Sequence, residues 1–236
     1  LHTMIKNLIF DLGGVLLDID LPYCMKQVQS LGINLDDFSA KTTATTPPSS
    51  SKPAVMGEGI IANGIINLYQ VGAITTEVFF STIQQHCRPG TTLQQVLDAW
   101  NSCCIGIPQY RLDKVMELRK RGYHTYMLSN TNDAHWIDIV NRCFGGQQQV
   151  NRYFDRVFLS QEMHLAKPND DIYLEVLQKI QAQPDECLFI DDSTPNIEAA
   201  QALGFHTIHA NVSLTREGKV IDPPESDWTT SIDDML

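Results

Sequence analysis

The stretch IFDLGGVLLDID, residues 9 to 20, decides the fold. The apolar run at residues 8 to 10 predicts a buried strand, and Gly13 and Gly14 predict a tight turn where backbone approaches another group closely. Asp11 would then lie at the carboxyl end of the strand, where open α/β sheets bind ligands. Since an aspartate before a glycine is more often a turn residue than a reactive one, this stretch needs support from the rest of the chain.

From residue 109 onward, helical and strand patterns alternate. Strands are predicted at YHTYML (123–128), RVFL (156–159), CLFI (187–190) and FHTIH (205–209). Helices are predicted at RLDKVMELRKRG (111–122), at DDIYLEVLQKI (170–180) behind a capping Asp170, and at STPNIEAAQALG (193–204) behind Ser193 or Thr194. Repeated β-α units imply a doubly wound, Rossmann-like parallel sheet with helices on both faces, which is an α/β fold.

Residues 19 to 108 break this alternation. They carry helical patterns and no convincing strand, and the spacing from Thr91 to Gln94 predicts a capping box. The segment KTTATTPPSSSKP, residues 41 to 53, has the composition of a loop. We therefore expect a Rossmann-like core at residues 1–18 and 109–236, with a smaller all-helical domain inserted at 19–108.

Composition excludes several classes of function. The chain of 236 residues has 28 acidic and 17 basic residues, a net charge of −11 that disfavours binding to nucleic acid or to an anionic membrane. The six cysteines show no C-x-x-C pair and the seven histidines no H-E-x-x-H pattern, so a zinc site has little support. We expect reduced cysteines and, without a leader-like or membrane-spanning apolar run, a cytoplasmic protein.

Each predicted core strand is followed by a side chain suited to phosphoryl transfer. Asp11 follows the first strand, Ser129 lies in LSNTND after the second, and Lys167 in AKPND follows the third. Asp191 and Asp192 follow the fourth, and two adjacent carboxylates repel each other unless a cation such as Mg²⁺ joins them. Taken singly, Ser129 and Asp191 could be helix caps and Lys167 a surface residue. Their order at successive strand ends favours a single site.

The chain resembles the haloacid dehalogenase superfamily, in the branch with a helical, C1-type cap inserted after the first motif. The resemblance covers about residues 5 to 209 and rests on DLGGVLLD, LSN, AKP and IDDSTPN, with GAITTEVF in the cap. It implies that Asp11 is the nucleophile, with Lys167 as the second catalytic residue. It also implies that Ser129, Asn130 and Lys167 bind the phosphoryl group, and that Asp11, Asp191, Asp192 and the Gly13 backbone carbonyl hold Mg²⁺. Asn196 would at most support these ligands.

One position departs from the family pattern. The usual first motif has a second aspartate two residues after the nucleophile, which serves as general acid, and here that residue is Gly13. A branch resembling sugar-1-phosphate phosphatases also lacks it. A positioned acid contributes about 10² to 10⁴ in rate, or roughly 3 to 5 kcal/mol. Asp18, Asp20, a cap residue or water could replace it, although the position of Asp18 favours a flap or structural role.

The sequence thus predicts an Mg²⁺-dependent hydrolase of small phosphate monoesters, with sugar phosphates among the candidates, that works through an aspartyl-phosphate intermediate. Its partner would be a small phosphorylated metabolite, and the protein would be a monomer or a homodimer. One alternative is a catalytically impaired relative that binds a phosphorylated ligand or a partner. Another is a 2-haloacid dehalogenase, whose reaction needs no cation and would leave the aspartate pair at 191 and 192 unexplained.

Overall fold

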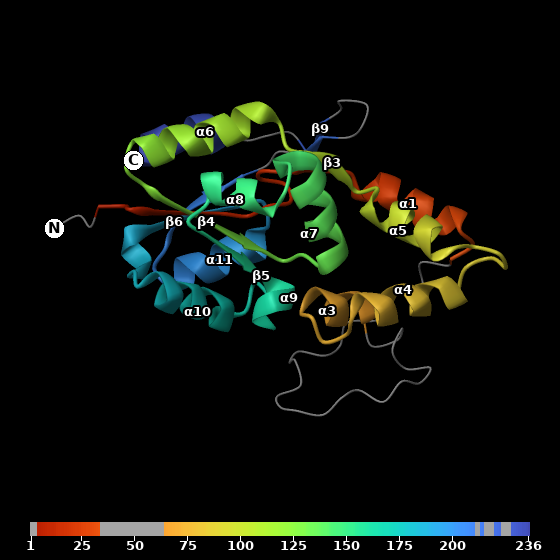
Figure 1. Cartoon of the computed structure of the whole chain (residues 1–236). Coiled ribbons are helices and arrows are strands. Elements are labelled where there is room, and N and C mark those ends of the chain that lie inside the picture. Colours follow the sequence, from red (N-terminus) through yellow and green to blue (C-terminus); the bar gives the residue numbers. More distant parts are fainter. Residues whose placement is uncertain (1–3, 34–63, 211–212, 215–219, 223–227) are drawn as a thin grey trace.

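A five-stranded parallel sheet forms the centre of the protein (Figure 1). The computed structural model describes residues 4–33, 64–210, 213–214, 220–222 and 228–236. The strands are β1 (Asn7–Phe10), β4 (His124–Ser129), β5 (Arg156–Leu159), β6 (Cys187–Asp191) and β7 (His206–His209). Their order is β5-β4-β1-β6-β7, so the first strand lies in the middle. The prediction of a doubly wound α/β core is confirmed.

The strand register brings the predicted site residues to one edge. Phe10 at the end of β1 is opposite Met127 in β4 and Ile190 in β6. Because the strands are parallel, the residues that follow these positions lie side by side at the carboxyl edge. Asp11, Ser129 and Asp191 are therefore neighbours in space, although they are far apart in the sequence.

Successive side chains of β1 point to opposite faces of the sheet, and both faces are buried. Leu8 and Phe10 join the core under one layer of helices, and Ile9 joins the core under the other. The first layer consists of α6 (Gln109–Lys120), α7 (Asp133–Ile139), the π-helix η2 (Val140–Phe144), α8 (Gln147–Tyr153) and α12 (Trp228–Met235). The second consists of α10 (Asp170–Ile180) and α11 (Thr194–Ala202), and η3 (Pro184–Glu186) precedes β6. A strand covered on both faces is mostly apolar, as residues 8 to 10 of β1 are.

The helices described between β1 and α6 form a separate group beyond the sheet edge (Figure 1). The described helices there are α1 (Leu21–Ser30), α3 (Ile65–Gln70), α4 (Thr76–Gln85) and α5 (Leu93–Asn101). They share a hydrophobic cluster in which Tyr69 stacks on Phe79 at 4.2 Å between ring centroids. The predicted loop at 41 to 53 lies outside the described residues.

A small antiparallel pair connects this helical group to the core, and the prediction of no strand between residues 19 and 108 was wrong here. Strand β2 (Asp18–Ile19) pairs with β3 (Cys104–Gly106). Two- and three-residue strands are too short to show a period in the sequence. A second short pair, β8 (Ser213–Leu214) with β9 (Val220–Asp222), lies near the carboxyl terminus.

The helical group also contacts the core directly through α9 (Ser160–Met163). The Ser160 hydroxyl donates to the Gln70 carbonyl at 2.6 Å, and a ring nitrogen of His164 lies 3.0 Å from the Val71 carbonyl oxygen. At Gly72, where φ is +66°, an added Cβ would collide with the Gln161 backbone. The end of α3 is therefore held against the core at short range.

Two predicted caps are displaced by one residue. The capping box begins at Thr92 and closes with Gln95, because α5 begins one residue later than expected. Asn169 rather than Asp170 precedes the first turn of α10.

Among the described residues, no helix has both the length and the apolar character needed to cross a membrane.

Candidate active site

Lys167 is a buried ammonium held between two carboxylates. Its side chain is 1% exposed, and Nζ lies 3.0 Å from Asp11 Oδ1 and 2.6 Å from Asp191 Oδ2. It also donates to the Leu128 carbonyl oxygen at 3.0 Å. Burial by itself would lower the pKa of Lys167, but the charges of Asp11 and Asp191 outweigh burial and raise it. The lysine is therefore a fixed positive charge beside Asp11.

Asn130 holds the loop that carries this lysine. Its side-chain amide donates to the Lys167 carbonyl at 2.8 Å and accepts from the Lys167 N–H at 2.9 Å. Asn130 thus binds the lysine backbone with both ends of its side-chain amide. Ser129, the last residue of β4, is also buried.

The two adjacent aspartates have different surroundings. Asp191 is fully buried, and its oxygens accept from Lys167, from the Asn196 amide at 2.9 and 3.1 Å, and from the Ser193 N–H at 2.8 Å. Asp192 is only partly buried and borders the cavity described below. Of the pair, Asp192 is the carboxylate that is free to meet a ligand.

Three acidic side chains crowd together here with one cation. Ligand atoms of Asp11, Asp191 and Asp192 lie within 4.8 Å of one another. Burial, then the charges of Asp191 and Asp192, raise the pKa of Asp11 to about 8 against the opposing effect of Lys167. Burial and then Asp191 raise the pKa of Asp192 to about 6. An additional cation would relieve this excess of negative charge, and an all-oxygen donor set suits Mg²⁺.

The two glycines of the first motif have different constraints. Gly14 has φ +77°, and an added Cβ would collide with the Asp192 carboxylate, so only glycine allows this close approach. At Gly13 an added Cβ would meet only Ile19 side-chain atoms, at 3.7 and 3.8 Å. The missing acid is therefore not excluded by the shape of the backbone.

A cavity of about 330 Å³ opens between the sheet edge and the helical group. Of the predicted residues, it is lined by Asp11, Gly13, Ser129, Asn130 and Asp192. Lys167 and Asp191 are buried beside Asp11. The structure therefore brings all the predicted side chains together at one place.

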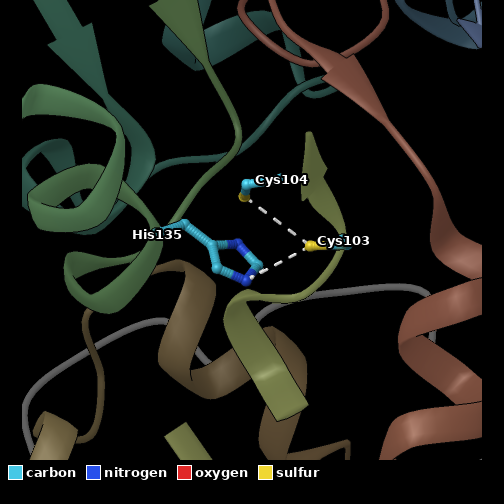
Figure 2. Close-up of side chains that lie close together, drawn as sticks. All are labelled: Cys103, Cys104 and His135. Atoms are coloured by element: carbon cyan, nitrogen blue, oxygen red, sulfur yellow. Dashed lines mark hydrogen bonds between the residues drawn. The ribbon is translucent and has the colours of Figure 1, made fainter. Parts of the chain in front are cut away.

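Sequence reasoning missed a second set of residues on the wall of this cavity. Trp100, Cys103 and Cys104 come from the end of α5 and the start of β3, and Asn132 and His135 come from the amino-terminal end of α7. Figure 2 shows the two cysteines and His135 facing one another. Nothing in the sequence marks them, because the histidine is far from the cysteines along the chain.

Asp18, which was considered as a replacement for the general acid, already forms an ion pair with Arg111. Arg111, which is completely buried, donates from Nη1 to Asp18 Oδ1 at 2.8 Å and to the Leu16 carbonyl at 3.0 Å. Asp20 caps α1 by accepting from the Tyr23 N–H at 2.9 Å. Both contacts support a structural role for these two aspartates.

The chain belongs to the haloacid dehalogenase-like hydrolase family, whose model matches residues 5–204. It is 28% identical over 205 residues to the D-ribitol-5-phosphate phosphatase of Bacteroides thetaiotaomicron, covering 86% of this chain and 91% of the relative. It is 24% identical to a sesquiterpene phosphatase of Aspergillus oryzae, covering 90% of this chain and 93% of that one.

A solved structure of the same family is similar over nearly its whole length. It is a haloacid dehalogenase family enzyme from Bacteroides thetaiotaomicron in complex with magnesium and inorganic phosphate. The TM-score is 0.73 with 32% sequence identity, and the match covers 93% of this chain and 96% of the other. The resemblance inferred from the motifs is confirmed, as is membership of a hydrolase family that includes phosphatases.

Proposed function

We propose that this protein is an Mg²⁺-dependent phosphatase of small phosphate monoesters, with Asp11 as the nucleophile. The observation that carries the proposal is the buried Lys167 ammonium 3.0 Å from Asp11, at the sheet edge where Asp192 borders the same cavity. A carboxylate next to fixed positive charge is suited to attack a phosphoryl group whose oxygens carry negative charge. The phosphatase relatives support the same chemistry.

Asp11 would attack phosphorus in line with the leaving oxygen. The Leu12 N–H and Lys167 both donate to Oδ1, which would leave the other carboxylate oxygen for the attack. The P–O bond to the alcohol breaks as the aspartyl-phosphate forms, and water then hydrolyses that intermediate. Lys167 offsets charge on the transferred group, and the Ser129 hydroxyl and the backbone N–H of Asn130 would bind its oxygens.

Asp11, Asp192 and the Gly13 backbone carbonyl would hold Mg²⁺. Asp191 was also predicted as a ligand, but its contacts with Lys167, Asn196 and Ser193 support a different part for it, which is to fix the lysine and add negative charge. When bound, the ion would neutralise charge on the phosphoryl oxygens and on Asp11.

The helices inserted between β1 and α6 would act as the cap that selects the substrate, with the domain division at residues 19–108. They supply Leu21, Ile66, Gln70 and Trp100 to the cavity, so the wall opposite Asp11 is largely apolar. A small phosphorylated metabolite, sugar phosphates included, would fill a cavity of about 330 Å³.

The free thiols of all six cysteines support a reducing compartment such as the cytoplasm.

A phosphatase screen with Mg²⁺ tests the proposal. It should compare sugar 1-phosphates, sugar 6-phosphates, alditol phosphates and prenyl phosphates, each with a chelator control. We expect turnover of at least one class that disappears when the chelator removes Mg²⁺. Turnover unaffected by the chelator would contradict the metal requirement.

The absent acid at Gly13 motivates a second candidate, an impaired family member that binds a phosphorylated ligand. Such a protein would show no turnover across the whole panel, while inorganic phosphate with Mg²⁺ would still raise its melting temperature. The same screen therefore separates the two candidates.

A further inference from the structure

Two thiols and an imidazole meet on the wall of the cavity (Figure 2). Cys103 Sγ lies 3.7 Å from Cys104 Sγ and 3.5 Å from His135 Nε2. Potential ligand atoms of all three residues lie within 4.8 Å of one another. Both cysteines are buried; Cys103 directly precedes β3 and Cys104 is its first residue, while His135 comes from α7.

The two separations measured from Cys103 Sγ match those of ligands around one tetrahedral ion. With Zn–S bonds of about 2.3 Å and Zn–N bonds of about 2.0 to 2.1 Å, a tetrahedral angle places two sulfurs about 3.8 Å apart and sulfur and nitrogen about 3.5 to 3.6 Å apart. We propose that Cys103, Cys104 and His135 form a binding site for a thiol-preferring divalent ion of the zinc class. The fourth position would face the cavity and be filled by water.

The protonation state of the imidazole supports this site. Burial lowers the pKa of His135 to about 4, so the ring is neutral at physiological pH, and the neutral form is the one that binds metals. The ring stacks on Trp100 with centroids 5.1 Å apart and planes at 14°, which keeps Nε2 on the side of Cys103. The surrounding charge also favours a cation, since the chain carries −11 and the cavity contains Asp11 and Asp192.

Asn132 sets the affinity of the site through the second ring nitrogen. Its Oδ1 accepts from the backbone N–H of His135 at 3.1 Å, and its Nδ2 lies 3.1 Å from the ring nitrogen Nδ1 of His135. Nδ1 therefore accepts, and Nε2 carries the ring proton toward the Trp100 carbonyl at 3.2 Å. Metal binding at Nε2 needs the opposite tautomer, with Nδ1–H pointing at an acceptor. A carboxylate at position 132 would provide that acceptor and keep the helix cap.

The site shares its cavity with the candidate catalytic residues. An ion there would border the space in which a substrate binds, and we expect zinc to slow turnover even when magnesium is saturating. This consequence rests on the proposed function, but the binding of zinc does not.

Cobalt and zinc titrations of the reduced, full-length protein in excess Mg²⁺ test the site. Co²⁺ should bind with one-to-one stoichiometry and produce near-ultraviolet thiolate-to-cobalt charge-transfer absorption, which carboxylate ligands cannot give. Competition with a chromophoric chelator then measures the zinc affinity. We expect Cys103→Ser and Cys104→Ser each to weaken it at least roughly 100-fold, and Asn132→Asp to tighten it about tenfold.

Matched variants distinguish zinc bound at this site from zinc bound by other side chains. Cys87→Ser and Cys143→Ser remove cysteines outside the cluster and should leave zinc affinity within about twofold of wild type. Asp11→Asn should do the same, which separates zinc at the cysteines from zinc at the aspartates. In the wild-type protein, zinc should protect Cys103 and Cys104 from alkylation, a result that needs no variant to fold. Absence of the charge-transfer bands, or alkylation of both cysteines at an unchanged rate, would overturn the proposal.

Discussion

At the residue scale, Gly14 is a position where the methyl group of an alanine would contact a side chain of the site. Gly14→Ala would force alanine into a left-handed backbone at φ +77° and push the new Cβ into the Asp192 carboxylate. Strain of this kind costs about 1 to 3 kcal/mol, and a displacement of about 1 Å in a catalytic group can cost roughly 100-fold in rate. We expect kcat/KM to fall at least that far.

Gly90→Ala is the matched control, because Gly90 has φ +87° with nothing within 4 Å of an added Cβ. Chemical denaturation and steady-state kinetics should show a similar backbone cost in both variants and a loss of activity in Gly14→Ala alone. Equal activity in the two variants would show that the contact with Asp192 has no consequence for the reaction.

Gly13→Asp tests whether the general acid is truly missing. The backbone at Gly13 accepts a Cβ with only ordinary contacts to Ile19, so the variant should fold. A positioned acid helps a poor leaving group most, and its full contribution is about 10² to 10⁴ in rate. We expect faster turnover of alkyl phosphates and a new acidic group in the pH–rate profile, measured against Gly13→Ala. Identical profiles for the two variants would mean that another group already donates the proton.

The residues of the candidate site could be predicted because parallel strands end at a common edge. The same reasoning could not predict which hydrogen bonds and ion pairs each of these residues makes. It treated Asp191 and Asp192 alike, whereas Asp191 is saturated by Lys167, Asn196 and a backbone N–H. Which of two neighbouring carboxylates turns inward depends on the path of the chain after β6, which the sequence pattern does not encode.

At the scale of elements, the buried pair of Arg111 on α6 and Asp18 on β2 connects the core to the start of the inserted helices. Arg111 is fully buried, and its Nε and Nη2 atoms have no hydrogen-bond partner among the described residues, so Asp18 is its main electrostatic support. Removing one member of a buried pair typically costs about 3 to 5 kcal/mol. We expect Asp18→Asn to lower the free energy of unfolding by about that amount in urea denaturation.

The double variant Asp18→Asn with Arg111→Met is the control for this prediction. Because it removes the uncompensated charge, it should cost clearly less than the sum of the two single variants. Additive costs would show that the pair is not coupled.

Long periodic elements could be predicted from the sequence and short ones could not. β5 and α10 have the bounds that their apolar patterns predicted. β2 and β3 were missed because their pairing depends on Asp18 and Gly106, which are far apart in the sequence, meeting in space. The cap of α10 was placed one residue late because Asn169 and Asp170 are both good capping residues.

At the scale of the whole molecule, His135 couples stability to pH. Burial lowers its folded-state pKa to about 4, below the ordinary value of 6.5 that applies to the unfolded chain. As the pH falls below 6.5, the unfolded chain takes up the proton first, so the contribution of His135 to stability is complete above pH 6.5 and is lost toward pH 4. The loss should reach up to about 1.4 kcal/mol per pH unit.

Urea denaturation of the zinc-free protein between pH 7 and pH 4 measures this effect as the difference between wild type and His135→Gln. The difference is needed because Asp11 and Asp192, whose pKa values are raised, titrate in the same range with the opposite sign. Parallel curves for the two proteins would contradict the account of His135.

The overall architecture followed from the sequence because each β-α unit carries its own local signal. The far wall of the cavity did not, because it forms only when α5, β3 and α7 pack together. Cys103, Cys104 and His135 have no motif spacing, and a zinc site therefore found no support before the structure placed their side chains together.

The most direct test of the central claim is the turnover of Asp11→Asn on the best substrate from the phosphatase screen, with its melting temperature measured alongside. The substitution keeps the shape of the side chain and removes the nucleophilic charge beside Lys167. We predict a fall in kcat of at least about 10³ with the fold retained. Activity within about tenfold of wild type would contradict the assignment of Asp11 as the nucleophile.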